Sequence, residues 1–287
     1  MILALAPDRI YLFHPCAIQA GNHSCFGEHN IRSRDSDTTG EHSMKKYLIG
    51  LIVAAIVLSA GGCGRKKSTI PTSLPKGEQT RALAVGDRMV YDLAVSVTNA
   101  KGINAGTAQG KVTVKVQKAD KHQPVPADVK KTYHISEVME VQDIPTGQIA
   151  WVGQGTDGTI YFLGRLEQGK DWSLVQGKKL NVDTPAILAD GKSWGYTTKL
   201  SGGKTETDTY KIVGTERVKT PAGEFEAYKA ESETKLSDGR LAKGFIWLRP
   251  EFPRPIKIRL DLSNVKQLNR SITSVEQVLS SYKFAKP

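Results

Sequence analysis

The strongest constraint on the fold is a strict alternation of apolar and polar residues that begins near residue 86. In the segment DRMVYDLAVSV, every second residue from Met89 to Val97 is apolar. The segments KVTVKV at 111–116 and IKIRLDL at 256–262 have the same period of two. Successive side chains of a β-strand point to opposite faces, so this period predicts strands with one buried and one solvated face.

The same region predicts the fold class. It contains no long amphipathic helical pattern, and turn-forming groups such as Asp157-Gly158 and Pro221-Ala222-Gly223 separate the alternating runs. Residues 86–287 are therefore predicted to be mainly β, an antiparallel meander that forms a curved sheet, half-barrel or barrel after a disordered or helical N-terminal signal region. A weak similarity between GDRMVYDL at 86 and GKSWGYTTKL at 191 indicates two meander halves, 86–190 and 191–287. Chance similarity between strands is the alternative.

A second pattern precedes the β region. Two lysines stand before an apolar run over residues 47–58, and small residues then lead directly into Cys63. The run is too short for a helix that spans a bilayer, which needs ~20 residues. A basic start, a short apolar run and a small-residue end are the parts of a secretory signal peptide, predicted here for residues 44–62.

Residues 44–63 resemble the signal region of bacterial lipoproteins, in which the cysteine receives a diacylglycerol and its amine a further acyl chain such as palmitate. The resemblance implies lipidation of Cys63 and a membrane anchor in the cell envelope. This family prefers Leu three residues before the cysteine, where this chain has Ala60. Gly64 stands where Asp would retain such a protein in the inner membrane, so the resemblance implies an outer-membrane protein that faces the periplasm. The alternative is an ordinary signal peptide or short anchor.

The segments on either side of the signal pattern are predicted to lack regular structure. Because a signal peptide acts near the N-terminus, translation is expected to start at Met44, which makes residues 1–43 a wrongly assigned, unstructured extension. The His and Cys residues of that extension match no usual zinc spacing: His14, Cys16, His23, Cys25 and His29. Residues 63–85 are polar, basic and proline-containing, and are expected to be a tether between the membrane and the β domain.

The charge of the chain indicates the kind of partner. It has 40 Lys and Arg against 29 Asp and Glu, a net charge of +11, and the excess lies after residue 62. Such a charge favours anionic partners. The lysines are spread out, without a basic helix or an aromatic RNA-binding motif, so nucleic acid is not expected. The expected partners are the membrane, through the lipid anchor, and an anionic lipid, a glycan or an envelope protein.

Residues suited to catalysis or metal binding are sparse after Cys63. No other cysteine follows, and the only histidines are His122 and His134. GQGTDG at 153–158 matches G-x-G-x-x-G, but the strand-like TIYFLG follows where a dinucleotide site needs a helix, so a hairpin turn is predicted. The sequence therefore predicts no catalytic residue, no metal and no cofactor, and a protein that is not an enzyme.

The second half carries a more specific pattern: GKSWGYTTKL at 191–200, YKIVGTERVKTPAGEFEAYKA at 210–230 and FIWLRP at 245–250. This order resembles uncharacterised bacterial lipoproteins and periplasmic proteins, the TapB or DUF3108-like β proteins. The resemblance implies a β fold and says almost nothing of chemistry. The large residues of the pattern are expected to be core or ligand-lining side chains: Trp194, Tyr196, Phe245 and Trp247.

Two functions follow from these predictions. The first is a non-catalytic envelope lipoprotein whose β domain interacts with an envelope component or a protein partner. The alternative is a carrier or binder of a lipid-like hydrophobic ligand in a β half-barrel. A filled core favours the first function, and an apolar cavity favours the second.

Overall fold

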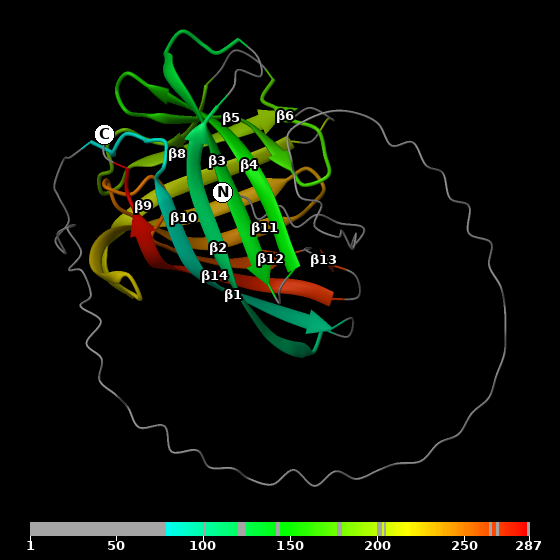
Figure 1. Ribbon diagram of the computed structural model, residues 1–287. Coiled ribbons are helices and arrows are strands. Elements are labelled where there is room, and N and C mark those ends of the chain that lie inside the picture. The colour runs from blue at the N-terminus through cyan, green and yellow to red at the C-terminus, as the bar shows by residue number, and fades with distance from the viewer. Residues whose placement is uncertain are drawn as a thin grey trace, which may run out of the picture. The chain divides into compact units, whose positions relative to one another are not determined.

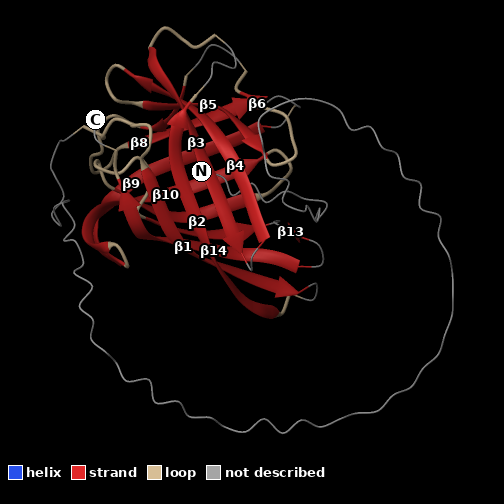
Figure 2. Ribbon diagram, viewed as in Figure 1, coloured by secondary structure: helices blue, strands red, loops and turns tan. Residues whose placement is uncertain are grey.

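The computed structural model describes residues 79–99, 102–119, 124–141, 144–176, 180–199, 203, 205–263, 266–267 and 270–285. In these ranges all regular secondary structure is β-strand, and no helix is present, as Figure 2 shows. None of the segments so described forms an apolar helix long enough to cross a membrane. Cys63, His122 and the predicted segments 1–43 and 44–62 lie outside the described residues, as does most of the tether.

The strands of the first part of the chain are β1 (Arg88–Asn99), β2 (Asn104–Lys118), β3 (Val129–Val141), β4 (Ile144–Gly155), β5 (Ile160–Glu167), β6 (Ser173–Leu174) and β7 (Asn181–Thr184). Those of the second part are β8 (Ser193–Lys199), β9 (Thr205–Thr220), β10 (Gly223–Leu236), β11 (Leu241–Leu248), β12 (Lys257–Ser263), β13 (Lys266–Gln267) and β14 (Arg270–Lys283).

All of these strands belong to one 14-stranded antiparallel sheet, which confirms the predicted fold class. The strand order is β6-β5-β4-β3-β2-β1-β14-β12-β11-β10-β9-β8, with β13 paired to β14 and β7 paired to β5. Strand β14 thus joins two runs in which each strand pairs with its neighbour in sequence. The division of the domain at residue 190 stays a prediction.

The sheet is curved and brings its two ends together. Strands β2–β4 cross in front of β10–β12 in Figure 1. Beyond β6, the backbone N–H of Gln176 donates to the carbonyl of Lys199, the last residue of β8, at 3.0 Å. No strand ladder between β6 and β8 is present in the described ranges, so a seam remains between the ends.

The alternation seen in the sequence decides which side chains form the core. Met89, Tyr91, Leu93 and Val95 of β1 are buried as predicted, and the residues between them are partly or fully exposed. The buried apolar side chains form two clusters. The first cluster draws many of its residues from β1–β5 and β14, and the second lies over β9–β12.

The GQGTDG segment forms the predicted hairpin turn. Strand β4 ends at Gly155 and β5 begins at Ile160. The Asp157 carboxylate accepts a hydrogen bond from the backbone N–H of Thr159 at 2.9 Å. Gly158 has a φ of +91°, which favours glycine because it has no Cβ. The motif is a turn between strands and does not precede a helix N-terminus.

Candidate functional site

The most unusual feature of the fold is a group of charged side chains inside the sheet. Its members are at most 10 % exposed and come from β3, β5, β7, β9 and the link between β11 and β12. Buried charges are costly unless they are paired, so this group demands a physical explanation. We call it the polar layer: Glu137, Arg165, Asp183, Glu206, Asp208 and Arg254.

Two members of the polar layer occupy core positions of β9. In the segment TETDTYKI, Glu206, Asp208, Tyr210 and Ile212 are buried, whereas Thr209 and Lys211 are exposed. The alternation of the strand thus directs two carboxyl groups, two residues apart, to the inner face. Asp208 is fully buried, and one of its oxygens accepts a hydrogen bond from the Thr234 hydroxyl of β10.

Two arginines pair with three carboxyl groups of the polar layer, those of Glu206, Asp183 and Glu137, across the curved sheet. Arg165 of β5 places Nη2 2.7 Å from Oε2 of Glu206. Arg254 places Nη1 3.0 Å from Oδ2 of Asp183 and Nη2 3.6 Å from Oε1 of Glu137. Each ion pair joins segments that are far apart in sequence. The polar layer therefore holds the two ends of the sheet together where no strand ladder does.

The electrostatics of the layer favour a proton on Glu206. Burial raises the pKa of Glu206 to about 7, the neighbouring Asp208 also raises it, and Arg165 opposes the rise. The second oxygen of Asp208 has no hydrogen-bond partner within the described residues. Burial also raises the pKa values of Tyr196 and Tyr210, so these phenols stay neutral. Glu206 is thus poised to titrate near neutral pH.

Two small cavities border the polar layer. One is lined by Arg165, Glu206 and Tyr196, the other by Trp194, Tyr210 and Ile258, and Asp183 and Arg254 line both. Each has a volume of about 30 Å³. That is room for one or two water molecules.

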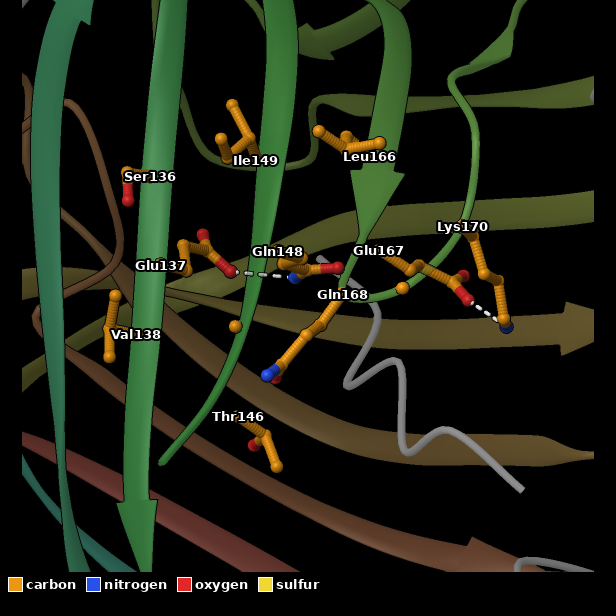
Figure 3. Close-up of a pocket in the computed structure, with 12 residues that line it drawn as sticks. Ser136, Glu137, Val138, Thr146, Gln148, Ile149, Leu166, Glu167, Gln168 and Lys170 are labelled. Atoms are coloured by element: carbon orange, nitrogen blue, oxygen red, sulfur yellow. Dashed lines mark hydrogen bonds and ion pairs between the residues drawn. The ribbon is translucent and has the colours of Figure 1, made fainter. Parts of the chain in front are cut away.

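Larger pockets open at the surface. One of about 380 Å³ lies at the ends of β3, β4 and β5 and includes Ile149, Leu166 and Lys170, as Figure 3 shows. Its wall also contains Glu137 and Gln148, which line an interior cavity too, and Nε2 of Gln148 donates to Glu137 at 2.8 Å. This hydrogen bond joins Gln148 in the wall of the surface pocket to Glu137 of the polar layer.

The four aromatic residues singled out in the sequence do not form one site. Tyr196 lines an interior cavity beside the polar layer. Trp194 stacks on Tyr210 with ring centroids 5.1 Å apart, and it lines a surface pocket of about 740 Å³ together with Phe245. Trp247 is only 5 % exposed and packs as a core residue.

Lysines surround the two aromatic residues of β11. The Nζ atom of Lys229 lies 4.6 Å from the ring centroid of Phe245, and that of Lys257 lies 5.2 Å from the ring of Trp247. These are cation–π distances. His134 of β3 stacks on Trp172, with ring centroids 5.2 Å apart. In the described part of the chain, no group of three His, Cys, Asp or Glu side chains is arranged to hold a metal.

Sequence reasoning missed the polar layer, although part of its signal is visible. Acidic residues at alternate positions of TETDTYKI, in phase with the apolar core positions Tyr210 and Ile212 that follow, mark carboxyl groups that point inward. Glu137 follows the buried Tyr133 and Ile135 with the same period. The arginine partners carry no such local signal because they come from distant strands and a loop.

Comparisons with known proteins give only weak similarity. No protein-family model and no curated protein matches the chain. A crystal structure from Bacteroides fragilis, described as an exported protein with a YmcC-like fold, is 14% identical, covers 72% of this chain and 100% of its own, and has a TM-score of 0.39. Another from Parabacteroides distasonis, described as a lipoprotein, is 12% identical, covers 73% and 100%, and has a TM-score of 0.36. Both similarities are too weak to carry an argument about this chain.

Proposed function

We propose that the chain is an exported envelope lipoprotein, anchored through Cys63, that has no catalytic activity and presents its β domain to another envelope component. The signal-like residues 44–62, the following cysteine and the resemblance to TapB or DUF3108-like proteins support export and lipidation. Gly64 supports delivery to the outer membrane. The net charge of +11 supports an anionic partner.

The filled interior is the observation that carries this proposal. Ligand sites typically have volumes of about 300–1,000 Å³, whereas the two cavities beside the polar layer hold about 30 Å³ each. Three of the four carboxyl groups in the layer are paired with Arg165 or Arg254, and Asp208 accepts a hydrogen bond from Thr234. A substrate has no space between them, which supports a protein that works through its surface.

Lipid labelling and cell fractionation test the anchor. The wild-type chain, expressed in a Gram-negative bacterium, is expected to incorporate labelled palmitate and to sediment with the outer membrane. Cys63→Ser should lose the label, and Gly64→Asp should keep it but move to the inner membrane. An unlabelled wild-type chain would refute lipidation, and a labelled chain in the inner membrane would refute the sorting.

A hydrophobic-ligand carrier is the second candidate function, and one observation favours it. The surface pocket of about 380 Å³ has Val138, Ile149 and Leu166 in its wall. Native mass spectrometry of residues 68–287, purified from a periplasm without detergent, decides between the two functions. A clean apo mass is expected. A reproducible extra mass that matches a lipid in the extract would favour the carrier instead.

A further inference from the structure

The register of the sheet places three cations in one row. Arg88 of β1 lies directly opposite Lys115 of β2 on one side and Lys283 of β14 on the other. All three side chains are exposed, and none forms an ion pair with a described carboxylate. Like charges directly opposite each other destabilise a sheet. The row therefore lowers the stability of the isolated domain.

Three lysines of the second part of the sheet are arranged differently. Lys229, Lys243 and Lys257 each lie within 3 Å of a glutamate on a neighbouring strand. Beside the cationic row the facing positions are neutral: Ser136 lies opposite Lys115, and Thr113 lies opposite Val90. The positive charge of the row is thus left uncompensated by its surroundings.

The row lies where the predicted tether reaches the sheet. Arg88 is the first residue of β1, and Lys283 is the last residue of β14. Next to Arg88, the buried Asp87 accepts a hydrogen bond from the backbone N–H of Ala285 at 2.9 Å, which fixes the C-terminal segment there. Cys63 precedes Gln79, the first described residue, by a stretch of chain that spans at most roughly 55 Å when extended.

We propose that the row of Arg88, Lys115 and Lys283 binds the phosphate groups of the anionic bilayer that holds lipidated Cys63. The inference rests on the proposed lipid anchor and extends it to a defined docking face. Strands are ~4.8 Å apart, so the three charges extend over about 10 Å of one face. Attraction to an anionic surface is screened beyond ~8 Å at physiological salt, so these cations gain it only when this face lies against the bilayer.

Acetylation footprinting of the lipidated full chain tests the docking face. The chain is reconstituted by its anchor into vesicles of phosphatidylcholine, alone or mixed with phosphatidylglycerol, and treated with an amine-reactive acetylating reagent. Mass spectrometry should show several-fold slower acetylation of Lys115 and Lys283 on the anionic vesicles. The exposed Lys211 and Lys235 serve as controls and should react equally on both. High salt should abolish the protection.

A variant isolates the role of the row without changing the reporter lysines. Arg88→Gln should lower the protection of Lys115 and Lys283, whereas Lys211→Gln should leave it unchanged. Circular dichroism confirms that each variant is folded. Equal acetylation on both vesicles, or equal protection of Lys211, would overturn the docking face while leaving the anchor intact. A chain that does not float with vesicles of either composition would instead refute the proposed anchor.

Discussion

At the scale of single residues, the protein keeps ionisable groups in two unfavourable places. Glu206 and Asp208 lie beside each other inside the sheet, and Arg88 lies between two lysines on its surface. The first arrangement is relieved by Arg165 and by the raised pKa of Glu206. The second has no partner among the described residues. Both arrangements make stability depend on solution conditions.

Glu206 should make stability fall between about pH 4.5 and pH 7. Its folded-state pKa is about 7 and its ordinary value is 4.5, so the folded protein binds this proton more tightly than the unfolded chain. The contribution is complete below the lower value and lost as pH rises to the upper one, on the order of 3 kcal/mol. Glu206→Gln should remove this fall, measured as urea-unfolding free energy at several pH values.

The readout is how the unfolding free energy changes with pH, not its absolute value. The absolute value also changes, because Glu206→Gln removes the ion pair with Arg165 and the carboxyl group next to Asp208. Glu233→Gln is the matched control, since Glu233 is 43% exposed and paired with Lys243. It should leave the profile parallel to that of the wild type. A Glu206→Gln profile that is also parallel to the wild type would contradict the assignment.

Arg88→Gln should stabilise the lipid-free domain. Removing the central cation relieves repulsion with Lys115 and Lys283 and should raise the unfolding free energy by ~0.2–1 kcal/mol at low ionic strength. The gain should shrink in high salt, where the repulsion is screened. Thermal unfolding at two salt concentrations measures the change. A salt-independent loss of stability would show that Arg88 has a structural partner.

At the scale of secondary-structure elements, the terminal strand β8 is the most exposed to disruption. It pairs only with β9 in the strand order, and it carries Trp194 and Tyr196 to the inner side of the sheet. Gly195 lies between them, and a Cβ built there would be 2.5 Å from the carbonyl oxygen of Asp208. Glycine at this position lets β8 lie close to the backbone of β9.

Gly195→Val should push β8 away from β9. The overlap with the Asp208 backbone should cost about 1–3 kcal/mol and accelerate hydrogen exchange of the β8 amides. Thr197→Val is the control on the same strand, because Thr197 is exposed and loses only a hydroxyl contact with Thr207. It should change the unfolding free energy by less than about 0.5 kcal/mol. Equal effects of the two variants would argue against a close β8–β9 contact at Gly195.

At the scale of the whole described sheet, Arg254 joins three distant segments. It lies in the link between β11 and β12 and pairs with Asp183 of β7 and Glu137 of β3. Arg165 and Glu206 connect β5 to β9 in the same layer. These ion pairs replace strand pairing across the seam. The two ends of the sheet are therefore expected to unfold together.

Arg254→Met should destabilise the whole sheet. It leaves Asp183 and Glu137 buried without their cation, a change expected to cost about 3–5 kcal/mol. Arg240→Met is the control, since its ion pair with Asp238 lies in an exposed turn and should contribute less than ~1 kcal/mol. Urea unfolding, followed by tryptophan fluorescence and by far-UV circular dichroism, measures both. Two separated transitions in the wild-type protein would contradict a single cooperative sheet.

The fold class followed from the sequence because its signal is local. A period of two and glycine-containing turns each span a few residues, so β1, β2, β12 and the hairpin at Gly158 could be predicted from neighbouring residues alone. The inward direction of the carboxyl groups in TETDTYKI follows from the same local period of two, although that period does not show which cations pair with them. The signal-like residues before Cys63 are also local, and they remain the basis of the proposed anchor.

Only the tertiary structure decided which distant residues meet. The pairing of Arg165 with Glu206, and of Arg254 with Asp183, depends on how the whole sheet curves, and no local pattern specifies that curvature. The same holds for Tyr196 and Trp247, which are both large aromatic residues of alternating strand segments. Tyr196 lines a cavity beside the polar layer, whereas Trp247 lies in the apolar core. The cationic row depends on strand register, because a shift of one residue would turn Arg88 to the other face.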